Sequence, residues 1–411
     1  MQTTGKRPRQ LGKGAALRGR LSRPLREFMQ AETAGGAVLA AATVVALICA
    51  NSPLSQSYNT LWETELTLRL GRWELTEDLR HWVNDALMTI FFFVVGLEIK
   101  RELVTGELRD KKAAAMPAIA ALGGMVVPAA IYLGFNAGTP ASRGWGIPMA
   151  TDIAFSVGVL TLLGKRVPSS LKLFLLSLAI ADDIGGIVVI ALFYSGGIDL
   201  VAFLVAIALV GLILIVRGVR VTWIPAYLAL GSLLWLATFE SGLHPTLSGV
   251  ALGMLTPAAP SIVAGRHMPS VAQRLEHQLL PWSSFVVVPL FALANAGISL
   301  NPAEFGRAAR SPIGLGVALG LLLGKPIGIT LFSWLAQGLR LGKLPHRATW
   351  RQTIGTSGIA GIGFTVSLFI ATLAFEDLVA QGEAKVGILI GSLSSAVLGT
   401  ALLFKGGDEQ R

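Results

Sequence analysis

Twelve apolar runs recur along the 411-residue chain, and short polar segments separate them. A helix that crosses a bilayer needs about 20 mostly apolar residues. Only 14% of the residues are charged, whereas soluble domains carry about 25%, so a soluble domain or a string of them is excluded. We predict an all-α polytopic membrane protein with twelve transmembrane helices, near residues 31–50, 82–99, 113–134, 145–163, 171–194, 200–216, 223–239, 245–255, 281–296, 312–336, 354–375 and 383–404.

The basic residues predict which side of the membrane each loop occupies. Both tails and every second loop, with the adjoining span ends, hold 26 of the 34 Lys and Arg, and the other loops hold 7. Lys and Arg are retained on the cytoplasmic side. Both termini are therefore predicted to be cytoplasmic, which agrees with an even number of spans. The one remaining basic residue, Lys325, lies inside the tenth span.

The amino-terminal segment, residues 1–29, contains eight Lys and Arg against one acidic residue. Because such a segment before a first span is normally a topology signal, we predict a disordered basic cytoplasmic tail here, a membrane domain over 30–404 and a cytoplasmic tail over 405–411. A nucleic-acid arm and a cleaved signal peptide are alternatives, but the run at 31–50 is long for a signal peptide. We expect no nucleic-acid partner. The single cysteine, Cys49, permits no disulfide within the chain.

One segment between the first two spans has the alternation of a strand. In residues 65–75, three leucines alternate with polar residues and a Gly-Arg turn follows, which favours a β-hairpin on the extracytoplasmic side. An irregular loop is the alternative. An isolated hairpin is marginally stable in water, so we expect this one to pair, for instance with a second copy of itself.

Four ionisable residues fall inside the predicted spans: Asp152, Asp182, Asp183 and Lys325. Each such group costs roughly 2.5–3.5 kcal/mol on insertion scales and is a functional candidate by default. Buried ion pairs that only hold helices together are the alternative. Three carboxylates facing one ammonium leave an excess of negative charge that structural pairing does not require. We therefore predict a cation-binding site.

The two adjacent aspartates, Asp182 and Asp183, point about 100° apart on a helix. They cannot share one small cavity equally, so we expect one to face a hydrated cavity while a neighbour such as Lys325 holds the other. Burial and a nearby like charge both favour a protonated carboxylic acid. A carboxylate in such surroundings can hold either a proton or a competing cation.

Two of the predicted spans are expected to unwind midway. Pro148 precedes Thr151 and Asp152 in the fourth span, and proline disrupts helix hydrogen bonding; the eleventh span contains four closely spaced glycines. Broken helices leave dipole ends in the membrane, where Asp152 suits the positive ends and Lys325 the negative ends. The oxygens of Thr151 and Asp152 are also ligands that a hard cation prefers.

Acidic residues also gather at the cytoplasmic ends of the spans. Glu98 and Glu102 share a helix face, and Glu276 and His277 stand at the entry to the ninth span. Carboxylates clustered with a histidine can sense cytoplasmic pH, while a solvated charge cluster at the membrane edge is the alternative. The five histidines show no metal-ligand spacing, and we expect no cofactor.

Eight motifs extend over residues 28–404: NDALMTIFFFVVGLEIKREL, ATDIAFSVGVL, ADDIGG, SGLHPTLSGV, RLEH, PLFALANAG, GKPIGI and GIGFTVS. In order and spacing they resemble the NhaA-type sodium/proton antiporters of bacterial inner membranes. The resemblance implies twelve helices, with the third to fifth and tenth to twelfth related as inverted repeats and the interrupted fourth and eleventh crossing. It also implies that the protein is not an enzyme but an electrogenic, pH-regulated exchanger of sodium (or lithium) for protons that works by alternating access.

The same resemblance implies a role for each residue of the predicted cation site. Asp183 matches the principal cation and proton site, Asp182 its neighbour, and Lys325 the lysine that pairs with it. Asp152 and Thr151 match the groups at the helix crossing.

Other positions match the family outside the cation site. The hairpin at 65–75 matches the dimerisation element, so a homodimer in the lipid bilayer is expected. The residues that match the pH-response cluster and two further family positions are, respectively, Glu98, Glu102, Glu276 and His277, and Asp85 and His244.

One departure concerns regulation, because Leu280 stands where the family pattern has a second histidine after RLEH.

A cation-coupled organic-anion symporter of related fold is the alternative function, and it would show sodium-dependent uptake without net proton flux. An intramembrane aspartyl protease needs a carboxylate pair that shares a proton, and its GxGD motif is absent from the sequence. A retinal pump with Lys325 as Schiff base is disfavoured because Pro326 follows immediately.

Overall fold

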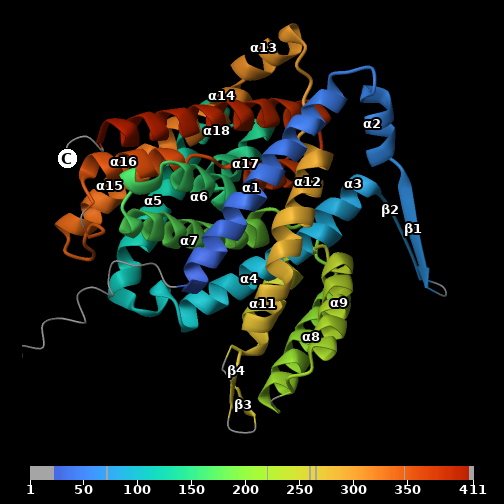
Figure 1. Ribbon diagram of the computed structural model, residues 1–411. Coiled ribbons are helices and arrows are strands. Elements are labelled where there is room, and N and C mark those ends of the chain that lie inside the picture. Colours follow the sequence, from blue (N-terminus) through green and yellow to red (C-terminus); the bar gives the residue numbers. More distant parts are fainter. Residues whose placement is uncertain are drawn as a thin grey trace, which may run out of the picture.

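The computed structural model describes residues 23–70, 73–219, 221–258, 261–263, 266–346 and 348–406. Helices dominate this part of the chain, and a two-stranded hairpin projects from the helical body (Figure 1). The elements in chain order are α1 (Arg23–Ala50), α2 (Ser55–Trp62), β1 (Glu65–Leu70), β2 (Trp73–Asp78), α3 (Leu79–Trp82), the π-helix η1 (Val83–Leu87), α4 (Met88–Val104), the 3₁₀ helix η2 (Glu107–Arg109), α5 (Lys111–Asn136), the 3₁₀ helix η3 (Pro140–Met149), α6 (Ile153–Leu162), the 3₁₀ helix η4 (Gly164–Arg166), α7 (Ser169–Phe193), α8 (Leu200–Gly218), α9 (Ile224–Glu240), α10 (Thr246–Leu255), β3 (Ser261–Val263), β4 (Arg266–Met268), α11 (Val271–Trp282), the π-helix η5 (Ser283–Val287), α12 (Val288–Asn295), α13 (Pro302–Arg310), α14 (Pro312–Leu319), the π-helix η6 (Gly320–Gly324), α15 (Lys325–Gly338), α16 (Trp350–Ile359), α17 (Phe364–Ala374) and α18 (Leu378–Gly406).

By length and composition, nine helical segments among the described residues can cross a membrane, and the bent pair α16 and α17 makes ten when it is counted as one. The seventh and eighth expected spans fall on shorter apolar helices, α9 and α10. The outer faces are apolar as well: α8, for example, exposes Leu204, Ile207 and Ile215. Exposed apolar helices of this length suit contact with lipid. The structure thus confirms a polytopic, mostly helical membrane protein.

Two boundaries differ from the sequence prediction. The ninth expected span begins at Val271 rather than at residue 281. The reason is a capping box, in which the Ser270 hydroxyl accepts a hydrogen bond from the Gln273 amide at 3.1 Å and the Gln273 side chain accepts one from the Ser270 amide at 3.0 Å. Pro281 lies inside this helix, and the π-helix η5 follows it directly.

The amino-terminal helix also begins earlier than expected. α1 starts at Arg23, inside the segment 1–29 that was expected to be a disordered tail, and Pro24 occupies the first turn, where proline is tolerated. Residues 1–22 lie outside the described residues. At the other end, α18 continues to Gly406, and the rest of the predicted tail 405–411 is likewise outside them.

The predicted hairpin is confirmed. β1 and β2 pair antiparallel, with Thr67 opposite Thr76 and Arg69 opposite Glu74. The two threonine hydroxyls lie 2.9 Å apart, and the arginine and glutamate form an exposed ion pair. The turn at 71–72 is not among the described residues. A second small hairpin, β3 with β4, was not predicted from the sequence.

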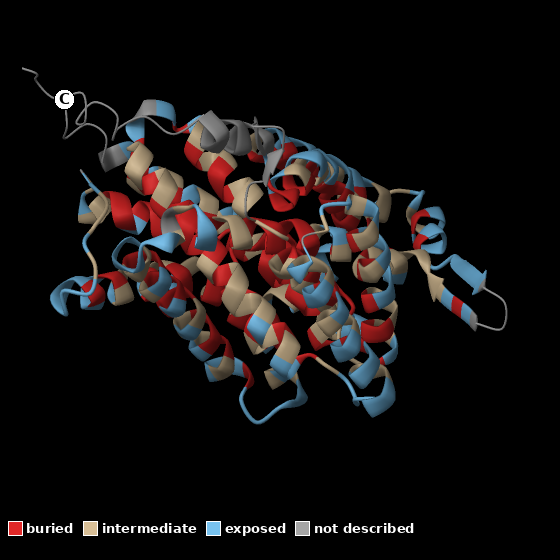
Figure 2. Ribbon diagram, turned by 90° about the horizontal axis from the view of Figure 1, so that it is seen from below, coloured by how far each residue is buried: buried red, intermediate tan, exposed pale blue. Residues whose placement is uncertain are grey.

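The buried residues gather in the middle of the helical body, while the outer loops and most of the hairpin are exposed (Figure 2). Within that core α5 packs closely against α15 and α7, and α18 packs against α14 and α16. Glycine makes the tightest of these contacts possible. A Cβ atom on Gly123 of α5 would overlap the Gly328 carbonyl oxygen of α15, and the reverse also holds. This close packing fixes α15, whose first residue is Lys325, against α5.

Candidate functional site

Two breaks in the helices meet in the core. Residues 150–152 are extended between η3 and α6, and α16 and α17 are bent by 49° at a break of four residues or fewer. The Asp152 amide donates to the Ile362 carbonyl at 2.6 Å, and the Ser156 hydroxyl donates to the Ile359 carbonyl at 3.1 Å. Each break therefore supplies partners for backbone groups that the other leaves without helical hydrogen bonds.

Asp152 lies where two of these broken helices begin. One carboxylate oxygen accepts a hydrogen bond from the Phe155 amide at 3.1 Å and so caps α6. The other accepts from the Thr365 amide at 3.0 Å and the Thr365 hydroxyl at 2.6 Å, in the first turn of α17. The side chain is buried. A negative charge at two helix amino ends has the favourable sign for both dipoles, so both oxygens of Asp152 already serve the fold.

Asp182 of α7 is held by Lys325 and Thr151. The Lys325 ammonium forms an ion pair with Asp182 Oδ2, and neither side chain is exposed. Lys325 Nζ also donates to the Thr151 hydroxyl at 3.0 Å. That hydroxyl lies 2.8 Å from Asp182 Oδ2 and 2.9 Å from the Ala360 carbonyl oxygen, and its single proton can serve one of them at a time. The contacts of Lys325 are thus with side chains rather than with helix carboxyl ends.

The position of Lys325 follows from a local irregularity. The π-helix η6 widens the helix immediately before it, and such single turns often occur at functional sites. Gly324 packs so closely on Pro128 of α5 that a Cβ there would lie 2.7 Å from the proline Cα. The backbone around Lys325 is therefore fixed by packing on α5.

Asp183 differs from its neighbour because it faces a cavity. The cavity has a volume of about 50 Å³ and is lined by Asp183, Thr151, Asp152 and Thr365, together with Glu98. That is room for about three water molecules. Within the described residues, Asp183 makes no hydrogen bond or ion pair, whereas Asp182 is neutralised by Lys325. The adjacent carboxylates thus lie in different surroundings, as their 100° separation on a helix predicts.

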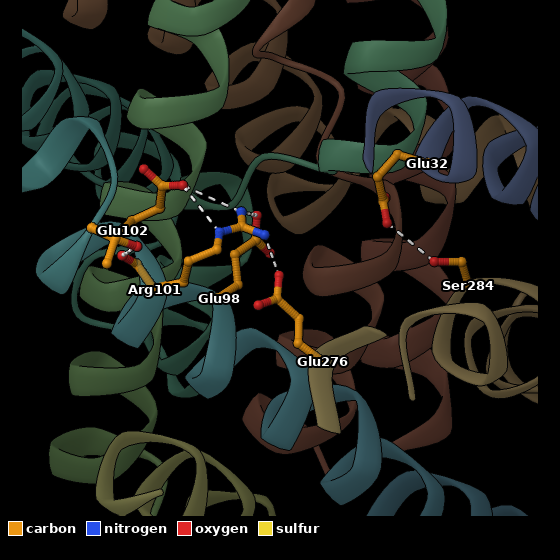
Figure 3. A network of polar contacts seen from close by, with 7 residues as sticks. Glu32, Glu98, Arg101, Glu102, Glu276 and Ser284 are labelled. Atoms are coloured by element: carbon orange, nitrogen blue, oxygen red, sulfur yellow. Dashed lines mark hydrogen bonds and ion pairs between the residues drawn. The ribbon is translucent and has the colours of Figure 1, made fainter. Parts of the chain in front are cut away.

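The predicted acidic cluster is organised by Arg101, which the sequence analysis did not single out. Arg101 forms ion pairs with Glu276, with Glu102 at 3.2 Å and with Glu98 at 3.7 Å (Figure 3). All three carboxylates are buried. His277 points outward and is exposed, so the structure does not bring it into the ion-pair cluster.

The two further family positions also meet. His244 Nε2 lies 3.5 Å from the Asp85 carboxylate, and its other ring nitrogen lies 2.8 Å from the Thr246 hydroxyl. The carbonyl of Asp85, in the π-helix η1, accepts a hydrogen bond from the Trp235 indole at 3.2 Å.

Sequence reasoning also missed Glu32 and Ser284, which line the cavity of Asp183. The sequence indicates a role for these two residues only weakly. Glu32 precedes a Gly-Gly pair by one helical turn, and Ser284 is a small polar residue in an apolar stretch. For Arg101, its place between two glutamates was a usable signal.

The structure combines many apolar helices with two helix breaks that contact each other and a buried lysine beside aspartates. These features are typical of multi-pass membrane proteins that transport ions. The family model described as Na+/H+ antiporter 1 matches residues 26–403. The chain belongs to this family.

Relatives named Na(+)/H(+) antiporter NhaA are similar over nearly their whole length. The relative from Shewanella sediminis (strain HAW-EB3) is 46% identical over 389 residues, which is 94% of this chain and 96% of the relative. The relative from Proteus mirabilis (strain HI4320) is 48% identical over 383 residues, 92% of this chain and 96% of the relative. The relative from Vibrio campbellii (strain ATCC BAA-1116) is 46% identical, with 92% and 94% covered. These relatives are bacterial, which supports a multi-pass bacterial membrane protein.

Proposed function

We propose that the chain is a sodium/proton antiporter in which Asp183 binds a sodium (or lithium) ion and a proton in turn. The observation that carries this assignment is the contrast between the two adjacent aspartates. Asp183 faces a small cavity and has no hydrogen-bond or ion-pair partner among the described residues, while Asp182 is paired with Lys325. A single carboxylate that is open to a small cavity binds either ion but not both.

The neighbouring groups supply a further oxygen for the cation and the second proton of the exchange. Thr151 lies at the cavity and offers a hydroxyl oxygen to the cation, and Asp152 supports the helix breaks beside it. Asp182 Oδ1 is buried and accepts no hydrogen bond from any residue in the described ranges. If a cation also attracts this oxygen, the ion pair with Lys325 weakens and the ammonium can release a proton. Two protons then leave for one cation, which makes the exchange electrogenic.

The membrane arrangement belongs to the same proposal. We assign twelve spans, counting α9 and α10, with both termini in the cytoplasm of the bacterial inner membrane. The third to fifth and tenth to twelfth spans form inverted repeats, and the fourth and eleventh cross at their breaks. The contacts between the Asp152 and Ile362 backbones support the crossing. Small rocking of the repeats switches the access of Asp183 between the two sides.

Two further parts of the proposal concern regulation and assembly. Glu98, Glu102 and Glu276 around Arg101 form the pH-responsive group, with His277 beside it. The hairpin joins two copies of the chain, because its Leu66 and Leu68 are 44% and 48% exposed and share one strand face. An organic-anion symporter is not favoured, since the relatives that match nearly the whole chain are named Na(+)/H(+) antiporters.

The test uses purified protein in proteoliposomes that enclose a pH dye. Vesicles loaded with sodium and diluted into sodium-free buffer should acidify inside, because outward sodium flow draws protons in. An inside-negative potassium diffusion potential should accelerate the acidification if more than one proton enters per cation. Sodium efflux without acidification would contradict the proposed function.

A further inference from the structure

A carboxylate outside the proposed set also faces the cavity of Asp183. Glu32 lies in α1 and is 9% exposed. Its Oε1 accepts a hydrogen bond of 3.1 Å from the hydroxyl of Ser284 in η5, which is 8% exposed (Figure 3). Both residues line the cavity.

The pair is built by close packing of α1. A Cβ on Gly35 would lie 2.8 Å from the Ser284 Cβ, and one on Gly36 would lie 3.0 Å from the Ala154 carbonyl oxygen. Gly35 and Gly36 follow Glu32 by three and four positions, so they share its helix face. The two glycines thus allow α1 to approach η5 and α6, and this approach carries the Glu32 carboxylate into the cavity.

Among the side chains that the structure describes, none supplies a counter-charge to this carboxylate. No basic side chain of residues 32–69, 74–164, 166–219, 221–258, 269–346 or 348–404 lies within ion-pair distance of Glu32. It does not cap a helix either, because α1 begins nine residues earlier, at Arg23. A carboxylate more than nine-tenths buried, with a single neutral hydrogen-bond donor among the described residues, is expensive to keep unless a cation or a proton compensates it.

A second carboxylate in the cavity points to the same ligand. Glu98 lines the cavity, and its Oε1 is buried without a hydrogen bond from any described residue. The Arg101 guanidinium is 3.7 Å away, beyond hydrogen-bond distance. The cavity therefore offers Glu32, Ser284 and Glu98 in addition to Asp183, all of them with the oxygen atoms that hard cations prefer.

We propose that Glu32, with the Ser284 hydroxyl and Glu98, forms a second cation position where sodium or lithium is held between the cytoplasm and Asp183. This inference rests on the proposed function and its topology, in which Glu32 lies in the amino-terminal, cytoplasmic half of α1 and Asp183 lies near the middle of α7. On this account a hydrated cation first meets Glu32, and Ser284 turns its oxygen toward the ion. The ion then moves within the same cavity to Asp183.

The test measures the sodium dependence of exchange at one fixed pH for Glu32→Gln, Ser284→Ala and the wild type. Loss of a charged ligand should raise the apparent KM of Glu32→Gln for sodium about tenfold, while the maximal rate falls less than about threefold. Ser284→Ala should raise KM about threefold, and the double variant should resemble Glu32→Gln because both act at one position. Glu32→Asp, which keeps the charge, should recover most of the affinity.

Glu63→Gln is the matched control, since Glu63 is exposed and lies at the end of α2. A KM within about twofold of wild type for both Glu32→Gln and Ser284→Ala would overturn the proposal. So would a shifted pH profile with an unchanged sodium KM, because Glu32 would then handle protons alone. Failure of the proposed function is read separately, as exchange that persists in Asp183→Asn, whatever the Glu32 variants show.

Discussion

Lys325 and Asp182 form an ion pair in which neither side chain is exposed to solvent. Such a pair offsets the desolvation of both charges only while both partners are present. In this chain the pair also leaves Asp183 as the carboxylate of the two that is open to the cavity. The division of roles between adjacent aspartates therefore depends on this one contact.

Removing one partner of the pair should destabilise the protein more than removing both. Lys325→Met leaves a buried carboxylate without its counter-charge, and we expect a loss of about 3–5 kcal/mol in folding free energy. Lys325→Met combined with Asp182→Asn should recover much of that loss. Thermal unfolding in detergent measures both variants. A double variant less stable than the single one would contradict the compensation argument.

Packing of α5 on α15 should tolerate no added methyl group at its closest point. Gly123→Ala places a Cβ against the Gly328 carbonyl, so we expect destabilisation of about 1–3 kcal/mol and a shifted Lys325. Gly134→Ala is the control in the same helix, because no atom lies within 4 Å of its Cβ position. Unfolding temperature and exchange rate should both fall for Gly123→Ala alone. Equal stability of the two variants would show that this contact is not limiting.

Loss of Arg101 should change how exchange responds to pH. Arg101→Gln removes the positive charge shared by Glu98, Glu102 and Glu276, and a nearby positive charge favours ionised carboxylates over protonated ones. The pH–activity profile should move toward alkaline pH by about one unit. Arg109→Gln is the control, since Arg109 is exposed in η2. A profile that stays in place would remove this cluster from the account of pH regulation.

The hairpin should carry the contact between two copies of the chain. Leu68 and Thr67 are adjacent in β1 and so point to opposite strand faces. Leu68→Glu places a charge on the apolar face and should convert the dimer into a monomer. Thr67→Glu places the same charge on the opposite face and should leave the dimer intact. Particle mass in detergent distinguishes the two states. Dimers that persist in Leu68→Glu would place the interface elsewhere.

The sequence predicted most of the site because its elements are costly in a membrane. Asp152, Asp182, Asp183 and Lys325 stood out as charges in apolar runs, and the hairpin stood out by its alternation. Helix geometry then predicted that the adjacent Asp182 and Asp183 lie in different surroundings. The resemblance of the motifs then assigned roles that geometry alone had left open.

The remaining features depend on contacts between distant segments. Glu32 and Ser284 are 252 positions apart and meet because two glycines allow α1 to approach η5. Arg101 and Glu276 are likewise joined across the fold. The early start of α11 is different, because its capping box of Ser270 and Gln273 is local and can be recognised in the sequence. Patterns in one sequence identify residues that are unfavourable in a membrane, but they do not identify the distant residues that contact them.

The most direct test of the central claim is sodium-driven proton exchange by Asp183→Asn in proteoliposomes, beside Glu63→Gln as the control. Asparagine keeps the size of the side chain but cannot alternate between a bound cation and a proton. The account predicts no exchange by Asp183→Asn at any sodium concentration, with folded protein confirmed by its unfolding temperature, and wild-type exchange by Glu63→Gln. Exchange by Asp183→Asn at the wild-type rate would contradict it.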